Sequence, residues 1–184
     1  MRSRGSRKPP APTGAEVVQW LLDWRDGDRV AGERLREKLA ARLARVALQT
    51  RWQQGGGELA AASEVVRGLY AEIEEATALA EEDLDRFVSI AAGELRRVLV
   101  DCAFRRSEEG DPRSFDEAVS LDRAIDRLAG LDPQLGRLVE LRCLVGLSLE
   151  QAARAAGIPV DSAQRDWQRA RALFPARIGR SGAA

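Results

Sequence analysis

Residues 147–174 read LSLEQAARAAGIPVDSAQRDWQRARALF, and this stretch predicts two short helices joined by a tight turn. Ser148 and Gln151 have the spacing of a capping box, in which the two side chains satisfy free backbone amides at a helix start. Gly157 can adopt the left-handed conformation that ends a helix. Ile158 follows it and is expected to fill the angle between the two helices.

The second helix of this stretch has two faces of different chemistry. Its apolar face consists of Ala163, Trp167, Ala170 and Phe174. Its open face carries amide and guanidinium groups at Gln164, Arg165, Gln168, Arg169 and Arg171. Glutamine can pair with adenine and arginine with guanine in the major groove, while further arginines suit phosphates.

We therefore expect a DNA-reading helix-turn-helix, in which the second helix carries most of the DNA contacts. Ser148 and Gln151 at the start of the first helix, and Ser162 at the start of the second, are further candidates for DNA contact. The alternative is an ordinary helical hairpin whose arginines face water.

The rest of the chain also has helical periodicity, without the alternation typical of strands. Apolar stripes at helical spacing occupy residues 17–24, 31–46, 62–73, 84–102, 118–128 and 135–145. A polar segment with glycine and proline, SEEGDPRS at 107–114, separates the fourth stripe from the fifth. The sequence thus predicts an all-α protein of two small helical domains joined by a short linker, the C-terminal one a helix-turn-helix.

Five segments follow from this organisation. The first is basic and rich in proline, glycine and serine, which is typical of disorder. The expected segments are a disordered basic tail at 1–14, a helical domain at 15–106, a linker at 107–115, a helix-turn-helix domain at 116–178 and a tail at 179–184.

The composition argues against an enzyme, a metalloprotein and a membrane protein. The 184 residues include 29 basic and 29 acidic side chains but no histidine, the commonest general base and metal ligand. Cys102 and Cys143 belong to no metal-binding pattern and are expected to be buried in a reducing compartment. No apolar run approaches the ~20 residues that span a bilayer. We expect a cytoplasmic binding protein without catalytic residues, metal or cofactor.

The segment from Leu121 to Phe174 resembles region 4 of extracytoplasmic-function (ECF) sigma factors, a subfamily of the sigma-70 superfamily. The resemblance rests on LAGLDP at 128–133, RLVELR at 137–142, GLSLEQAA at 146–153 and RDWQRARAL at 165–173. Upstream, LRRVLVD at 95–101 resembles part of region 2, and LDWRDGD at 22–28 resembles its opening helix. The similarity is strong in the C-terminal half and patchy before it.

The resemblance implies that the chain has two partners, core RNA polymerase and promoter double-stranded DNA. Region 2 would bind the polymerase clamp and melt the minus-ten element, and region 4 would read the minus-thirty-five element. Residues expected to bind polymerase are Val66, Arg67 and Tyr70. Region 2 residues expected to touch the DNA backbone are Arg96, Arg97, Arg105 and Arg106.

Region 2 nevertheless departs from the family pattern, and two of these departures bear on its expected contacts. Gly68 occupies a position where the family usually has an acidic residue that meets the clamp. The carboxylates of Glu81, Glu82, Asp83 and Asp85 stand where a polar, DNA-facing loop is usual. They would repel a DNA strand, whose affinity depends on phosphate neutralisation, or they form a solvated helix start, where carboxylates are favourable.

Two functions remain open from the sequence. One is an ECF sigma factor that directs core polymerase to specific promoters, with an anti-sigma factor or a kinase as a further partner. Phosphorylation of Ser63 or Thr77 could supply the charge that Gly68 lacks. The other is a sigma-derived DNA-binding or protein-binding regulator that no longer initiates transcription.

Overall fold

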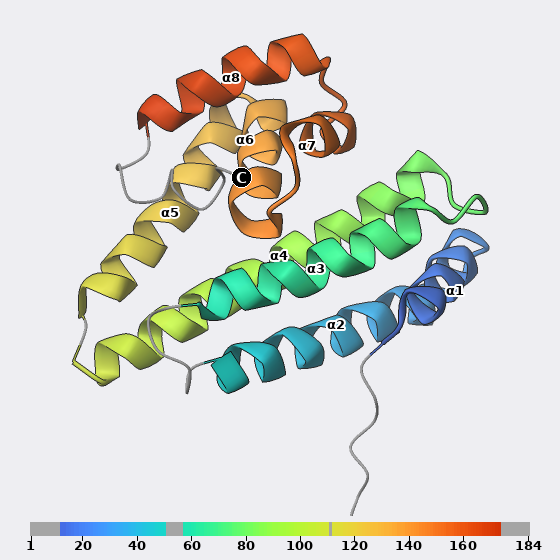
Figure 1. Ribbon diagram of the computed structural model, residues 1–184, viewed down its shortest axis with the longest axis horizontal. Helices are drawn as coiled ribbons and strands as arrows, with labels where there is room; N and C mark the ends of the chain where they lie inside the picture. Colours follow the sequence, from blue (N-terminus) through green and yellow to red (C-terminus); the bar gives the residue numbers. More distant parts are fainter. Residues whose placement is uncertain (1–11, 51–56, 111, 174–184) are drawn as a thin grey trace, which may run out of the picture.

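The computed structural model describes residues 12–50, 57–110 and 112–173. Within these ranges every regular element is helical and no strand occurs, so the predicted all-α class is confirmed (Figure 1). The elements are α1 (Gly14–Arg25), α2 (Arg29–Thr50), α3 (Glu58–Glu74), α4 (Glu81–Glu108), α5 (Pro112–Leu131), α6 (Pro133–Glu140), the π-helix η1 (Leu141–Val145), α7 (Leu149–Ala155) and α8 (Val160–Leu173).

Local hydrogen bonds explain where several helices begin. At the start of α1, the Thr13 hydroxyl accepts from the Glu16 amide at 3.3 Å, and the Glu16 carboxylate accepts from the Thr13 amide at 2.9 Å. At the start of α6, the Asp132 carboxylate accepts from the amides of the first helical turn, with Pro133 at the position that needs no donor. Thr13 with Glu16 therefore determines where α1 begins, and Asp132 with Pro133 determines where α6 begins.

The ends of the predicted tail and linker differ from the helix bounds. The tail predicted at 1–14 includes Thr13 and Gly14, which belong to the start of α1. The linker predicted at 107–115 is largely helical, because α4 extends to Glu108 and α5 begins at Pro112. Polar composition cannot separate an exposed helix end from a loop, so composition alone overestimated both segments.

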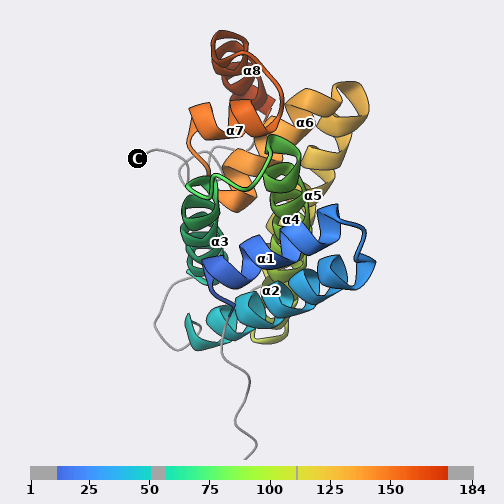
Figure 2. The same cartoon turned by 90° about the vertical axis from the view of Figure 1, so that its right-hand side faces the viewer.

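We describe the helices as two groups, which pack against each other (Figures 1 and 2). We call α1–α4 the N-terminal unit and residues 112–173 the C-terminal unit. α5 turns back along α4, η1 lies against α3 and α4, and α7 lies against α4. α6 reaches α4 through the Arg137 side chain. The two predicted domains are thus in direct contact.

A continuous apolar core crosses from one unit into the other. Phe87 and Leu69 in the N-terminal unit belong to the same buried cluster as Leu138 and Leu144 in the C-terminal unit. Each large apolar side chain that is removed from water contributes about 1.5–3 kcal/mol. The hydrophobic effect therefore holds the two units together as well as each unit by itself.

The C-terminal unit contains one irregular turn. α6 passes directly into η1, and the turn ends at Gly146, which has a left-handed backbone with φ +76°. Leu141, Leu144 and Val145 of η1 are fully buried. Short π-helical turns are uncommon and are frequent at functional sites. Here the turn brings three apolar side chains of the C-terminal unit into the shared core.

Candidate nucleic-acid interface

α7 and α8 are consecutive helices joined by the turn that the sequence predicts. The Ser148 hydroxyl accepts from the Gln151 amide at 3.1 Å, and the Gln151 side chain accepts from the Ser148 amide at 3.0 Å, which confirms the capping box. Gly157 has φ +65°, in the left-handed region. The Ile158 side chain is buried, and its amide donates to the Ala153 carbonyl at 2.9 Å. The turn thus fixes the direction in which α8 leaves α7.

The inner face of α8 packs on the rest of the C-terminal unit. Ala163 and Ala170 are fully buried, as predicted, and Trp167 is partly buried. The Arg142 guanidinium of η1 lies over the Trp167 ring, 4.9 Å from its centroid, which is a cation–π distance. A hydrogen bond of 2.8 Å from Arg142 to the Leu147 carbonyl orients this guanidinium. Phe174, which was expected on the same face, lies outside the described residues.

The outer face of α8 is exposed along its length. It carries the whole set that the sequence predicts for DNA reading, namely Gln164, Arg165, Gln168, Arg169 and Arg171. The polar contacts of Arg165 and Arg169 within the described residues stay inside the helix: Arg165 donates to the Ser162 hydroxyl at 3.2 Å, and Arg169 lies 3.7 Å from Asp166. Helix α8 therefore offers amide and guanidinium groups on one open face, which suits a DNA groove.

The other three candidates of this half lie at helix starts. Ser148 is exposed at the start of α7, and Ser162 is half-buried in the first turn of α8. Gln151 is half-buried because its side chain faces the N-terminal unit, where its amide nitrogen lies 3.4 Å from Glu74. Ser148 and Ser162 thus remain accessible, whereas the Gln151 side chain contacts Glu74 of the N-terminal unit.

Arg96, predicted to contact DNA, is surrounded by carboxylates of the C-terminal unit. Its guanidinium lies 2.7 Å from Asp126, 3.0 Å from Glu140 and 3.4 Å from Asp122. These carboxylates belong to α5 and α6. The Arg96 side chain therefore links the two units.

The other three arginines predicted for region 2 do not form one basic face with Arg96. Arg97 is exposed, 3.5 Å from the buried Glu94. Near the end of α4, the guanidinium of Arg105 lies 3.1 Å from the Cys102 sulfur, and that of Arg106 lies 3.2 Å from Glu58. Each guanidinium has a different partner, and of these four side chains only Arg97 is largely open to solvent.

The residues predicted for polymerase binding differ in exposure. Val66 is fully buried and Tyr70 is 4% exposed, whereas Arg67 is exposed. Burial raises the pKa of the Tyr70 hydroxyl, and the neighbouring Glu74 carboxylate raises it further. Gly68 is exposed, and a Cβ atom added there would meet no atom within 4 Å. In this conformation Arg67 and the backbone at Gly68 are therefore the accessible parts of the predicted segment.

The acidic stretch at 81–85 forms the first turn of α4. Asp83 is 1% exposed, and its carboxylate accepts from the Ala80 amide at 3.0 Å. The same carboxylate pairs with Arg25 at 3.1 Å and Arg86 at 3.3 Å. For Asp83, this geometry favours the helix-start interpretation over a role in repelling DNA.

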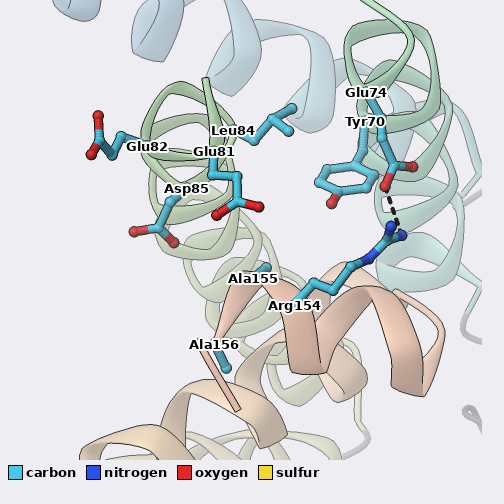
Figure 3. A pocket seen from close by; sticks show the side chains of 10 residues that line it. Tyr70, Glu74, Glu81, Glu82, Leu84, Asp85, Arg154, Ala155 and Ala156 are labelled. Carbon is cyan, nitrogen blue, oxygen red and sulfur yellow. Dashed lines mark hydrogen bonds and ion pairs between the residues drawn. The ribbon is translucent and has the colours of Figure 1, made fainter. Parts of the chain in front are cut away.

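Neighbouring carboxylates border a cavity between the two units. The cavity has a volume of about 460 Å³, and its lining includes Glu81, Glu82 and Asp85 of α4. Tyr70 and Glu74 of α3 lie on the other side, and Arg154 of α7 reaches from the C-terminal unit to Glu74 at 2.8 Å (Figure 3). Sequence reasoning missed Glu74 and Arg154, since no local pattern pairs residues eighty positions apart.

The two candidate phosphorylation sites also differ in accessibility. Ser63 is buried, with its hydroxyl between the carbonyls of Leu59 and Leu144, whereas Thr77 is exposed between α3 and α4.

The two cysteines are not paired, and burial raises the pKa of the Cys143 thiol to about 11. In the described ranges we find no set of metal-ligating side chains and no helix that could cross a membrane.

The C-terminal part of the chain is similar to a known protein family. Residues 106–179 match the family model described as ECF sigma factor. The match begins near the end of α4 and includes all of α5, α6, η1, α7 and α8. No curated protein and no solved structure matches the chain.

Proposed function

We propose that this chain is a member of the ECF sigma factor family and directs core RNA polymerase to specific promoters, because residues 106–179 match the model of that family. ECF sigma factors are a non-enzymatic family of transcription factors. In this proposal polymerase carries out the chemistry of RNA synthesis, and the present chain supplies promoter recognition.

One observation carries the DNA-binding part of the proposal. The outer face of α8 presents its glutamines and arginines to solvent, while Ala163, Trp167 and Ala170 hold the opposite face in the core. We propose that α7 and α8 act as a helix-turn-helix, with α8 in the major groove. Gln164, Arg165 and Gln168 would face base edges, and Arg169 and Arg171 would face phosphates.

Promoter-specific transcription with purified core polymerase tests this function. DNA ligands selected from a random pool would supply the promoter, and a run-off assay would measure initiation. The double variant Arg165→Ala/Gln168→Ala should abolish specific initiation, because it removes two base-reading side chains. Arg123→Ala is the matched control, because it removes an exposed guanidinium of α5, away from α8. Equal activity of the two variants would contradict the assignment of α8.

We further propose that the exposed side of α3 around Arg67 and Gly68 contacts the polymerase clamp. Gly68→Glu would place a carboxylate where the family usually has one, and open space surrounds this position. Gly93→Glu makes the same change at an exposed glycine of α4 that is also in open space. Interferometry should show tighter polymerase binding for Gly68→Glu only. The same change in both variants would contradict a specific contact at position 68.

A kinase could add the missing charge without a substitution. The exposure of Thr77 supports this residue over the buried Ser63 as the acceptor. Phosphorylation adds about −1.5 to −2 charges. Thr77→Glu should then strengthen polymerase binding and the neutral Thr77→Gln should not. Unchanged affinity in both variants would argue against regulation at this residue.

A second function is supported by the state of region 2. Arg96 is occupied by three carboxylates, and Glu81 and Glu82 are exposed at the start of α4. Both features favour a regulator that binds DNA through the C-terminal unit and does not open promoters. Permanganate footprinting distinguishes the two functions, since reactive thymines in a complex with polymerase would exclude the second.

A further inference from the structure

One face of α3 is directed at the C-terminal unit along most of the helix. Ser63, Arg67, Tyr70 and Glu74 are spaced by three or four residues, so their side chains project from the same side of α3. The Ser63 hydroxyl bonds to the Leu144 carbonyl of η1. This face is therefore in contact with the part of the chain that follows α5.

The other residues of this face have partners further along the same unit. The side chain of Arg67 lies against Gly146, where an added Cβ atom would be 3.2 Å from the Arg67 Cδ. The Glu74 carboxylate pairs with Arg154 of α7 at 2.8 Å, and Tyr70 lines the cavity next to this pair (Figure 3). The contact thus continues from η1 to the end of α7.

A parallel row on α4 makes the remaining contacts. Asp85, Ser89 and Arg96 lie on one side of α4, because they are four and seven residues apart. Arg137 of α6 reaches Asp85 at 3.1 Å and Ser89 at 2.8 Å. Arg96 makes its ion pairs with Asp122, Asp126 and Glu140 of α5 and α6. We call these rows of α3 and α4 together the α3–α4 face.

The α3–α4 face contains residues that the proposed function assigns to other partners. Tyr70, which is buried, and Arg67, which lies half exposed at the edge of the face, are predicted to bind polymerase. Arg96 is predicted to touch promoter DNA. We infer that the α3–α4 face is one binding surface with two mutually exclusive occupants, the chain's own C-terminal unit and core RNA polymerase. This inference rests on the proposed function and adds a regulatory step to it.

The charges on the C-terminal unit define what a competing partner must offer. Arg154 and Arg137 face the carboxylates of Glu74 and Asp85, and three carboxylates face Arg96. A polymerase surface that replaces this unit must present cations opposite Glu74 and Asp85. Arg96 also needs an anion once its three carboxylates have moved away, and promoter phosphates bound with polymerase would supply it.

The connection between the units is compatible with release of the C-terminal unit as one body. α4 ends at Glu108, and Gly110 has φ +102°, a conformation that costs glycine little. Many of the ion pairs across the interface are partly exposed, such as Arg154 with 64% of its side chain accessible. Salt and a charged competitor can therefore weaken them.

A charge-reversal experiment tests the competition. The opened variant Arg137→Glu/Arg154→Glu places four carboxylates against each other at the interface. The restored variant adds Glu74→Arg/Asp85→Arg, which re-forms both pairs with reversed polarity. The matched control, Arg123→Glu/Arg127→Glu, makes the same change of charge at two exposed positions of α5. Circular dichroism verifies that each variant keeps its helices.

Two measurements are made on each full-length variant. Energy transfer between dyes at the exposed positions 37 in α2 and 150 in α7 reports the separation of the units. Interferometry reports the affinity for core polymerase. We expect lower energy transfer and about tenfold tighter polymerase binding in the opened variant. Energy transfer should return toward wild type in the restored variant. Polymerase affinity is compared only between wild type, the opened variant and the control, because the restored variant also reverses two charges that polymerase would contact. The control should match wild type in both.

Three results would overturn the inference. Low energy transfer in the wild-type chain would show that the C-terminal unit does not cover the α3–α4 face. Separation of the units in the opened variant without tighter polymerase binding would exclude competition. A control as tight as the opened variant would assign the gain to net charge. Failure of the proposed function looks different, since then no variant binds polymerase, including one whose units are separated.

Discussion

The arginines of α8 and those of α4 have the same side chain but different surroundings. On α8, Arg165 and Arg169 are exposed and contact residues of their own helix, Ser162 and Asp166. On α4, Arg96 lies among three carboxylates of the C-terminal unit. An arginine in the first setting can bind a phosphate or a base without losing a tertiary contact, and one in the second setting cannot.

This difference shows why residue type alone is a weak indicator of a nucleic-acid interface. Before Arg96 could bind DNA, its ion pairs would have to break and the three carboxylates would need other partners, which is costly for the partly buried Arg96 and Glu140. The α8 face is therefore available in this conformation, whereas Arg96 becomes available only after a rearrangement.

Removal of the Arg96 guanidinium should give the largest effect on stability. Arg96→Ala leaves Asp122, Asp126 and Glu140 without their shared cation, so we expect a loss of about 2–4 kcal/mol in the free energy of unfolding. Urea denaturation measures it. Arg97→Ala, one residue along the helix, should cost less than about 0.5 kcal/mol because Arg97 is exposed. Similar losses for the two variants would show that the three carboxylates around Arg96 contribute little to stability.

On α8 the same kind of truncation should affect binding and leave stability unchanged. Arg165→Ala should weaken DNA binding by about 1–3 kcal/mol and relax the preference at one base pair, provided that Arg165 reads a guanine. Fluorescence anisotropy on a set of single-base variants of the selected site measures both. Arg169→Ala is the companion variant. It should weaken DNA binding equally for all the single-base variants, and the slope of log affinity against log salt concentration should decrease in magnitude by about one. A uniform loss for Arg165→Ala would place Arg165 on a phosphate.

Two glycines provide a smaller test of which surfaces are covered. Gly146→Ala puts a Cβ atom against Arg67 at a left-handed φ of +76°, so it should destabilise the protein by about 1–2 kcal/mol. Gly68→Ala lies on an exposed part of α3 with open space around it, and should stabilise the helix by up to about 1 kcal/mol. Thermal unfolding compares them. A neutral Gly146→Ala would indicate that the turn readily rearranges away from Arg67.

The sequence by itself determined the helices and the outer face of α8. Each apolar stripe corresponds to an observed helix, because the period of 3.6 residues is a property of the local chain. The same periodicity separates Ala163 and Ala170 from Arg165 and Arg169, so the exposed set on α8 was predictable. The turn at Gly157 and the capping box at Ser148 were predictable for the same reason, since both need only neighbouring residues.

The tertiary structure alone decided how the two units meet and which cations remain accessible. The contacts that join them connect residues far apart in the chain, such as Arg154 with Glu74 and Arg137 with Asp85. Val66 and Tyr70, predicted at a protein interface, are buried once the helices have packed. The sequence shows which side chains are charged and therefore what each of them could bind. The partner that each one has depends on distance and burial, and these are set only when the helices pack.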